Sequence, residues 1–223
     1  MAMSHSQVLT YRKIRFMPTS VAKKTKQTGR TGPDTRQRIL DATARVLSEN
    51  GYAGTKLSAI AEHAQLQAPA IYHYFASREV LIEETMWTGL AQMNVVMRER
   101  LAALPEDADP FQRLLSAVEI HLTYMFSTSD YAVAYLRNHA QLPPDIRERQ
   151  AQEATKLAVL WRELFQAAAA GGYIRKDLDL TMMRLSVVSS LNITSEWWTP
   201  RHGTVSELVA MTQEMVRSAI AAR

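Results

Sequence analysis

The chain has 223 residues, of which 47% are hydrophobic, and its formal net charge is +4. This apolar content is ample for a real core in one large domain or two small ones. The absence of cysteine excludes disulfides, thiolate metal sites and cysteine nucleophiles. No apolar run approaches the roughly 18 residues of a membrane span, and the N-terminus lacks the pattern of a secretory signal. We therefore expect a soluble, cytoplasmic protein without a membrane partner.

Positive charge is concentrated at the start of the chain. Residues 1–33 hold seven basic and no acidic side chains, whereas the rest has 19 basic and 22 acidic residues, a net charge of −3. This composition and its weak periodicity predict a flexible basic arm over 1–33. Such an arm suits contact with a phosphate backbone or a minor groove. A solvated leader with a start codon assigned too early is the alternative, and the sequence leaves both open.

Helical periodicity begins directly after the arm. Asp34 and Thr35 offer N-cap oxygens to a helix over 35–50, and Gly51 ends this helix where a positive φ costs little. Its predicted inner stripe consists of Ile39, Thr43, Val46 and Leu47.

Two short helices joined by a tight turn are predicted next, over 57–64 and 68–75. Thr55 is placed to cap the first, and Pro69 lies in the first turn of the second, where its missing N–H costs nothing. The second helix has an inner face of Ile71, Tyr74 and Phe75, opposite a small, polar and aromatic face of Gln67, Ala68, Ala70, Tyr72 and His73. Such a helix suits a DNA major groove, although an ordinary helical hairpin has the same periodicity.

The remaining chain is also helical throughout. Ser77 predicts the cap of a long helix from Arg78 to Ala103, and Asp179 predicts the cap of another that reaches Thr199. Further helices are expected over 111–126, 131–140, 145–170 and 204–221. With no strand pattern and no internal repeat, we predict an all-α fold of about nine helices. The domains are expected to be a helix-turn-helix head over 34–80 and a helical body over 81–223.

Enzyme signatures are missing from the sequence. The six histidines show no metal-like spacing with each other or with carboxylates, and no nucleophile elbow, phosphate loop or dinucleotide fingerprint occurs. We therefore assign no catalytic residue, no metal and no cofactor. A helical enzyme with an unrecognised site and a constitutive DNA-binding protein without an inducer stay open as alternatives.

The segment from Arg36 to Ile82 contains Gly51-Tyr52, Ile60-Ala61 and the run from Ile71 to Phe75. In these residues and their register it resembles the N-terminal domain of TetR-family transcriptional regulators. The family usually has glycine where Gln65 stands and often serine where Gln67 stands, so Gln65 must adopt a positive φ or the turn must shift. The matching residues are Arg36, Ile39, Leu40, Ala42, Ala44, Leu47, Gly51, Tyr52, Thr55, Ile60, Ala61, Ala64, Ile71, Tyr72, His73, Tyr74, Phe75, Ser77, Arg78, Glu79, Leu81 and Ile82.

This resemblance implies a homodimer that binds palindromic double-stranded DNA. Its base contacts would come from Gln67, Ala68, Ala70, Tyr72 and His73, and its phosphate contacts from Thr55, Lys56 and Arg78 at two helix starts. The alternatives are packing against the first helix for Tyr72 and a solvated charge for Arg78. The family's dimers pack their last two long helices together, which agrees with a helix after Asp179 that is apolar nearly all round. The alternative is a central helix of a monomer, which its place near the end of the chain disfavours.

The resemblance also implies an inducer pocket among the middle helices. Polar and aromatic residues on apolar helices are the candidate contacts, although each also fits plain core. They are His121, Tyr124, Met125, Arg137, Trp161, Phe165, Met183 and Asn192. The segment 196–200 (EWWTP), followed by Gly203, resembles a family branch with acyl-CoA-responsive regulators. We therefore expect a repressor released by a small hydrophobic or acyl-CoA-type effector, with Arg137, Arg147 and Arg149 as candidates for its phosphates.

Overall fold

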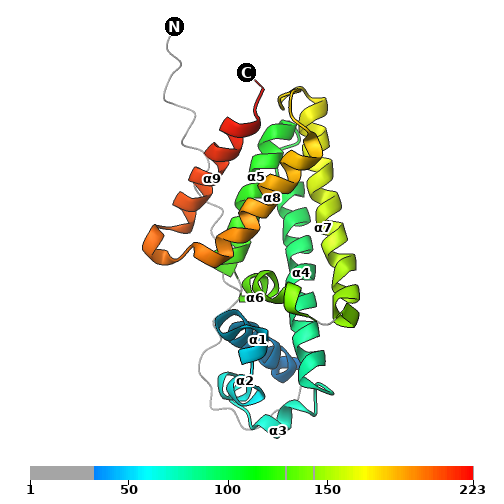
Figure 1. The fold of residues 1–223 in the computed structure, drawn as a ribbon, viewed down its shortest axis with the longest axis vertical. Helices are drawn as coiled ribbons and strands as arrows, with labels where there is room; N and C mark the ends of the chain where they lie inside the picture. Colours follow the sequence, from blue (N-terminus) through cyan, green and yellow to red (C-terminus); the bar gives the residue numbers. More distant parts are fainter. Residues whose placement is uncertain (1–32, 129, 143, 223) are drawn as a thin grey trace. The chain divides into compact units, whose positions relative to one another are not determined.

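The computed structural model describes residues 33–128, 130–142 and 144–222 (Figure 1). These residues form nine α-helices and no sheet, apart from an isolated antiparallel bridge between Ile174 and Ala221. The all-α prediction is therefore confirmed. The predicted basic arm lies outside the described residues, except for Pro33, which begins the first helix.

The first helix, α1 (Pro33–Gly54), carries the inner stripe that its sequence predicts. All four stripe residues are fully buried, and Gly51 kinks the helix with a φ of 70°. The predicted N-cap is wrong, because Asp34 and Thr35 lie inside a helix that starts at Pro33. Proline fits this first turn because the N–H that it lacks would have no partner inside the helix.

The second helix, α2 (Leu57–Ala64), has the predicted bounds and a different cap. Lys56 occupies the N-cap position without a side-chain cap bond, whereas the Thr55 hydroxyl donates to Gly51 O at 2.7 Å. The predicted capping role of Thr55 is thus wrong, because its hydroxyl serves a carbonyl at the kink. At the other end, Gln65 takes the left-handed conformation at φ 55°, while Leu66 N–H donates to Ala61 O at 2.8 Å. A residue other than glycine therefore closes a Schellman-type turn.

The third helix, α3 (Ala68–Ile71), is shorter than predicted. After Ile71 the N–H groups of Tyr72, His73 and Tyr74 donate to carbonyls three residues back, at 2.9–3.2 Å. The chain therefore continues through Tyr74 as a tighter 3₁₀-like turn, and Phe75 N–H closes it with an α-type bond to Ile71 O at 3.0 Å. Ile71 and Phe75 stay buried, as the inner face requires.

Long helices build the body. The Ser77 hydroxyl accepts from Val80 N–H at 3.1 Å and Asp179 accepts from Met182 N–H at 2.7 Å, so both predicted caps are confirmed. The helices are α4 (Arg78–Ala102), α5 (Pro110–Thr123), α6 (Asp130–Asn138), α7 (Pro144–Ala170), α8 (Leu180–Trp197) and α9 (Val205–Ile220), with a π-helical turn over Tyr124–Thr128. Their main core is built around Trp161, Tyr124 and Phe165.

Helix α6 lies between the head and the long body helices (Figure 1). Its Tyr131 hydroxyl donates to Asp41 at 2.8 Å, and its buried Asn138 donates to Leu47 O at 3.2 Å. Arg137 donates to Ser48 O at 3.0 Å on α1 and to Ser195 O at 3.1 Å on α8. These bonds join α6 to α1 on one side and to α8 on the other.

Candidate DNA-binding face and ligand pocket

The outer side of the α3 turn presents the predicted polar and aromatic residues. Gln67, Tyr72 and His73 are exposed, and Ala68 and Ala70 are half-buried. The Tyr72 side chain is 57% exposed and so lies outside the core of the head. Because Ile71 and Phe75 hold the turn from inside, the outer residues form a surface on a fixed support.

The three phosphate candidates differ in their surroundings. Lys56 is exposed at the start of α2, whereas Thr55 is buried, so its hydroxyl does not reach the surface. Arg78 donates from Nε to Thr55 O at 2.7 Å and also to Tyr52 O, and its guanidinium lies 4.8 Å from the Tyr52 ring centre. Arg78 is therefore not a simple solvated charge, because it ties the start of α4 to the segment before α2.

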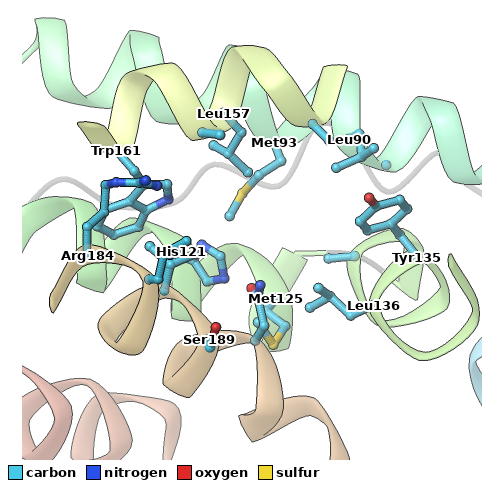
Figure 2. A pocket seen from close by; sticks show the side chains of 17 residues that line it. Leu90, Met93, His121, Met125, Tyr135, Leu136, Leu157, Trp161, Arg184 and Ser189 are labelled. Carbon is cyan, nitrogen blue, oxygen red and sulfur yellow. The ribbon is translucent and has the colours of Figure 1, made fainter. Parts of the chain in front are cut away.

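The body contains a cavity of about 290 Å³ among five helices, α4 to α8 (Figure 2). Its walls are mostly aliphatic, with a few polar groups, which is typical of sites for small apolar ligands. The lining residues are Gly89, Leu90, Met93, His121, Met125, Ala132, Tyr135, Leu136, Ala154, Leu157, Ala158, Trp161, Arg184, Leu185, Val188, Ser189 and Asn192.

Half of the predicted ligand contacts line this cavity. They are His121, Met125, Trp161 and Asn192. The other four do not line it, for separate physical reasons. Phe165 and Met183 pack into the main core, and the buried Tyr124 donates its hydroxyl to Gly89 O at 3.2 Å. Arg137 is held by the carbonyls of α1 and α8 described above.

The one cation in the described wall of the cavity, Arg184, was not among the predicted contacts. Arg184 lies in the wall, near Trp161 in Figure 2, whereas Arg149 pairs with Glu83 at 3.7 Å and lies 4.8 Å from the Trp87 ring centre. A usable signal existed in α8, because Leu185, Val188, Ser189 and Asn192 recur at spacings of three and four residues. This recurrence marks one face of a helix, and that face turns to the cavity.

Two aromatic residues of the cavity wall carry unpaired polar atoms. His121 is 3% exposed and Trp161 is 1% exposed, and their ring centres are 6.0 Å apart. Within the described residues, neither ring nitrogen of His121 nor Trp161 Nε1 has a hydrogen-bond partner. Burial lowers the pKa of His121 to about 4, and a weak hydrogen-bonding contact with the Asn192 side chain, outside the geometry of a full hydrogen bond, acts in the opposite direction. At neutral pH the imidazole is therefore uncharged, with one donor and one acceptor nitrogen.

The lowered pKa of His121 predicts a loss of stability in mild acid. The folded protein resists protonation of His121 down to about pH 4, whereas the unfolded chain takes up that proton near pH 6.5. This contribution to stability is complete above pH 6.5 and disappears as the pH falls toward 4. We expect the free energy of unfolding to fall by about 2 kcal/mol from this group between pH 7 and pH 5. Urea unfolding of the wild type and of His121→Phe at several pH values measures this loss. If the free energy of unfolding depended on pH equally in both proteins, the prediction would be wrong.

Two absences among the described residues bear on other kinds of site. No helix within them is long and apolar enough to cross a membrane. In the same part of the chain, no three histidine or acidic side chains come together as a metal site would require.

Family models match both halves of this architecture. The model for bacterial regulatory proteins of the tetR family matches residues 39–85, and the model for tetracyclin repressor-like C-terminal domains matches residues 107–220. The second match alone spans more than half of the chain. The protein therefore belongs to the TetR family of bacterial regulatory proteins.

Individual relatives agree with this assignment. The HTH-type transcriptional repressor KstR2 of Mycobacterium tuberculosis is 24% identical over 174 residues, which are 74% of this chain and 82% of that protein. The structure of AibR in complex with isovaleryl coenzyme A and operator DNA has a TM-score of 0.73 at 23% identity, covering 82% of this chain and 97% of AibR. For FadR of Bacillus subtilis with stearoyl-CoA the TM-score is 0.67 at 20% identity, with 82% and 98% covered.

Proposed function

We propose that the protein is a ligand-responsive transcriptional repressor. It binds a palindromic operator as a homodimer, and a small hydrophobic or acyl-CoA-type effector releases it. The observation that carries this proposal is that one chain has an apolar cavity in its body and an exposed recognition turn, residues 67–75, in its head. Helix α6 is hydrogen-bonded to α1 of the head and to α8 of the body. The complex of AibR with isovaleryl coenzyme A and operator DNA supports this combination, and the complex of FadR with stearoyl-CoA supports its acyl-CoA part.

The DNA surface of this proposal comprises the outer side of the recognition turn and the start of α2. Gln67, Tyr72 and His73 are the exposed side chains for the major groove, with Ala68 and Ala70 allowing close approach. Lys56 faces a phosphate, and its neighbouring helix start adds backbone N–H groups. Arg78 supports this surface, and Thr55 is left out because it is buried. The basic arm adds phosphate or minor-groove contacts.

The dimer surface is proposed on α8 and α9. Six of the large hydrophobic side chains that are exposed in the described residues belong to these two helices: Met182, Leu185, Ile193, Trp197, Met211 and Met215. An exposed apolar patch of this kind favours association. A second copy of the chain would cover it by packing the same two helices into a four-helix bundle.

Helix α6 is the proposed link between effector and DNA. Ala132, Tyr135 and Leu136 line the cavity, while Tyr131 and Asn138 on the same helix bond to α1. A ligand that favours a shifted α6 would therefore favour a different position of the head on α4. The two heads of the dimer would then no longer fit successive major grooves. The shift in population is limited by the difference in ligand affinity between the two states.

An effector panel tests this function. We expect octanoyl-CoA to raise the melting temperature and to release the protein from its operator, whereas glucose and serine do neither. A ligand present at 100 times its Kd adds about 2.7 kcal/mol of stability if it binds only the folded state. Differential scanning fluorimetry and fluorescence anisotropy of labelled operator DNA are the two measurements.

A variant with a smaller cavity serves as the control for this panel. Ala154→Leu adds bulk to the cavity wall on α7, away from the recognition turn. It should bind operator like the wild type and respond less to octanoyl-CoA. Stabilisation by glucose or serine, without any response to the acyl compound, would refute the effector class.

A further inference from the structure

Two residues that line the cavity carry buried polar atoms without a hydrogen-bond partner in the part of the chain that the structure describes. Within the described residues, six buried side-chain nitrogen and oxygen atoms lack a hydrogen-bond partner, and three of them belong to His121 and Trp161. A buried donor or acceptor without a partner is costly, and most native structures avoid it. Sites that keep such atoms are candidates for a bound group that supplies the missing partner.

These atoms come from helices that meet at the cavity. His121 is on α5, Trp161 is on α7, and Asn192 on α8 lines the same cavity and is close enough to act on the His121 pKa. Figure 2 shows the two rings in neighbouring walls, with Met93, Met125 and Leu157 around them. The ring centres are 6.0 Å apart. The ring nitrogens are covered by neighbouring atoms in this structure, so one oxygen can bridge the two rings once their side chains turn toward it.

The chemistry of these groups favours an uncharged oxygen. Trp161 Nε1 only donates, whereas the neutral His121 imidazole and the Asn192 amide both donate and accept. A carbonyl or hydroxyl oxygen would pair with them without adding charge to an apolar cavity. A hydrocarbon would leave the three ring nitrogens as they are. A carboxylate would bring a buried charge, and Arg184 is the one charged residue in the described wall.

We propose that His121, Trp161 and Asn192, together called the polar cluster, bind a neutral carbonyl or hydroxyl oxygen of the effector. The cavity then selects an oxygen-bearing ligand over a hydrocarbon of the same shape. This inference depends on one part of the proposed function, which is that the effector binds in the cavity. The oxygen has two possible sources, which are the thioester carbonyl of an acyl-CoA or an oxygen further along its acyl chain.

Two matched pairs of ligands separate these sources. Octanoyl-CoA is compared with its S-octyl thioether, which lacks the thioester carbonyl. The second pair is 7-oxo-octanoyl-CoA and 7-methyl-octanoyl-CoA, in which a methyl group replaces the chain oxygen. Isothermal titration calorimetry with the full-length protein should show about tenfold tighter binding of the oxygen-bearing member of at least one pair. Equal affinities within both pairs, or no binding by any of the four, would overturn the proposal.

Ring-preserving variants test the residues themselves. His121→Phe and Trp161→Phe remove the unpaired nitrogens and keep an aromatic ring. The ratio of affinities between the two members of a ligand pair should therefore fall to about one. His121→Phe should also be at least as stable as the wild type at neutral pH, because it removes two unpaired buried atoms. Trp161→Phe provides the test if His121→Phe does not fold. Met93→Leu changes the same wall without a polar atom and should keep the full preference.

Operator release by the same ligands is measured separately. A ligand preference that disappears in the ring variants, without any release of DNA, would support the polar cluster and refute the proposed function. Release of DNA by both members of each pair at equal concentrations would refute the polar cluster and leave the repressor function standing. An unchanged preference in both ring variants would also overturn the inference.

Discussion

Replacing Tyr72 by alanine is expected to weaken operator binding with little change in melting temperature. The side chain is 57% exposed on the outer side of the recognition turn, so its removal leaves the buried Ile71 and Phe75 untouched. Each lost contact of this kind costs about 1–3 kcal/mol, and the substitution occurs in both heads of a dimer. The loss in affinity should therefore reach about 2–6 kcal/mol per operator. Fluorescence anisotropy at a fixed salt concentration measures this loss, because affinity for DNA depends steeply on salt.

Two further substitutions give this prediction its controls. Glu62→Ala removes an exposed side chain on α2 and should leave both operator affinity and stability nearly unchanged. Ile71→Ala should lower stability by about 2–5 kcal/mol, because it opens a cavity in the head. A melting temperature that falls with Tyr72→Ala as it does with Ile71→Ala would mean that Tyr72 is part of the core.

Substituting Gly89 on α4 is expected to disturb the contact between α4 and α6. A Cβ atom at this position would lie 2.8 Å from Tyr131 O and 3.1 Å from Tyr131 C, and backbone atoms cannot turn aside as side chains do. Gly89→Ala should therefore displace the start of α6 and lower the free energy of unfolding by about 1–3 kcal/mol. For a chain of this size, each kcal/mol shifts the melting temperature by about 2–4 °C.

The same substitution should also weaken operator binding. Tyr131 donates to Asp41 on α1, so a displaced α6 alters the support of the head. We expect operator affinity in the absence of ligand to fall together with stability. Val95→Ala, at an exposed position on α4, is the matched control and should change neither. If Gly89→Ala had the same stability and operator affinity as the wild type, α4 and α6 would not be in close contact.

The helices could be predicted from sequence because their signals are local. The stripe on α1, the caps at Ser77 and Asp179, and the positive φ at Gly51 all follow from residue type and spacing, and all are confirmed. The wrong predictions arise where local signals compete. Asp34 and Thr35 are good caps, yet Pro33 is an even better first residue of a helix. Thr55 bonds to a kink that exists only once α1 has formed.

The cavity was only partly predictable because it depends on how helices face each other. Trp161 and Phe165 are one turn apart on α7 with similar chemistry, yet only Trp161 lines the cavity. On α8, the neighbours Met183 and Arg184 turn to the core and to the cavity respectively. Helical periodicity defines faces, and it does not say which face meets a void. The packing of five helices decides that.

A titration of one operator with protein and effector tests the central claim most directly. DNA selected from a random pool by the full-length protein is footprinted and then bound in the presence of octanoyl-CoA. We expect an inverted repeat whose half-sites are about 34–36 Å apart, two protomers on each site, and release as the acyl compound is added. A single asymmetric half-site occupied by one protomer, or a complex that keeps its DNA when acyl-CoA is bound in the cavity, would contradict it.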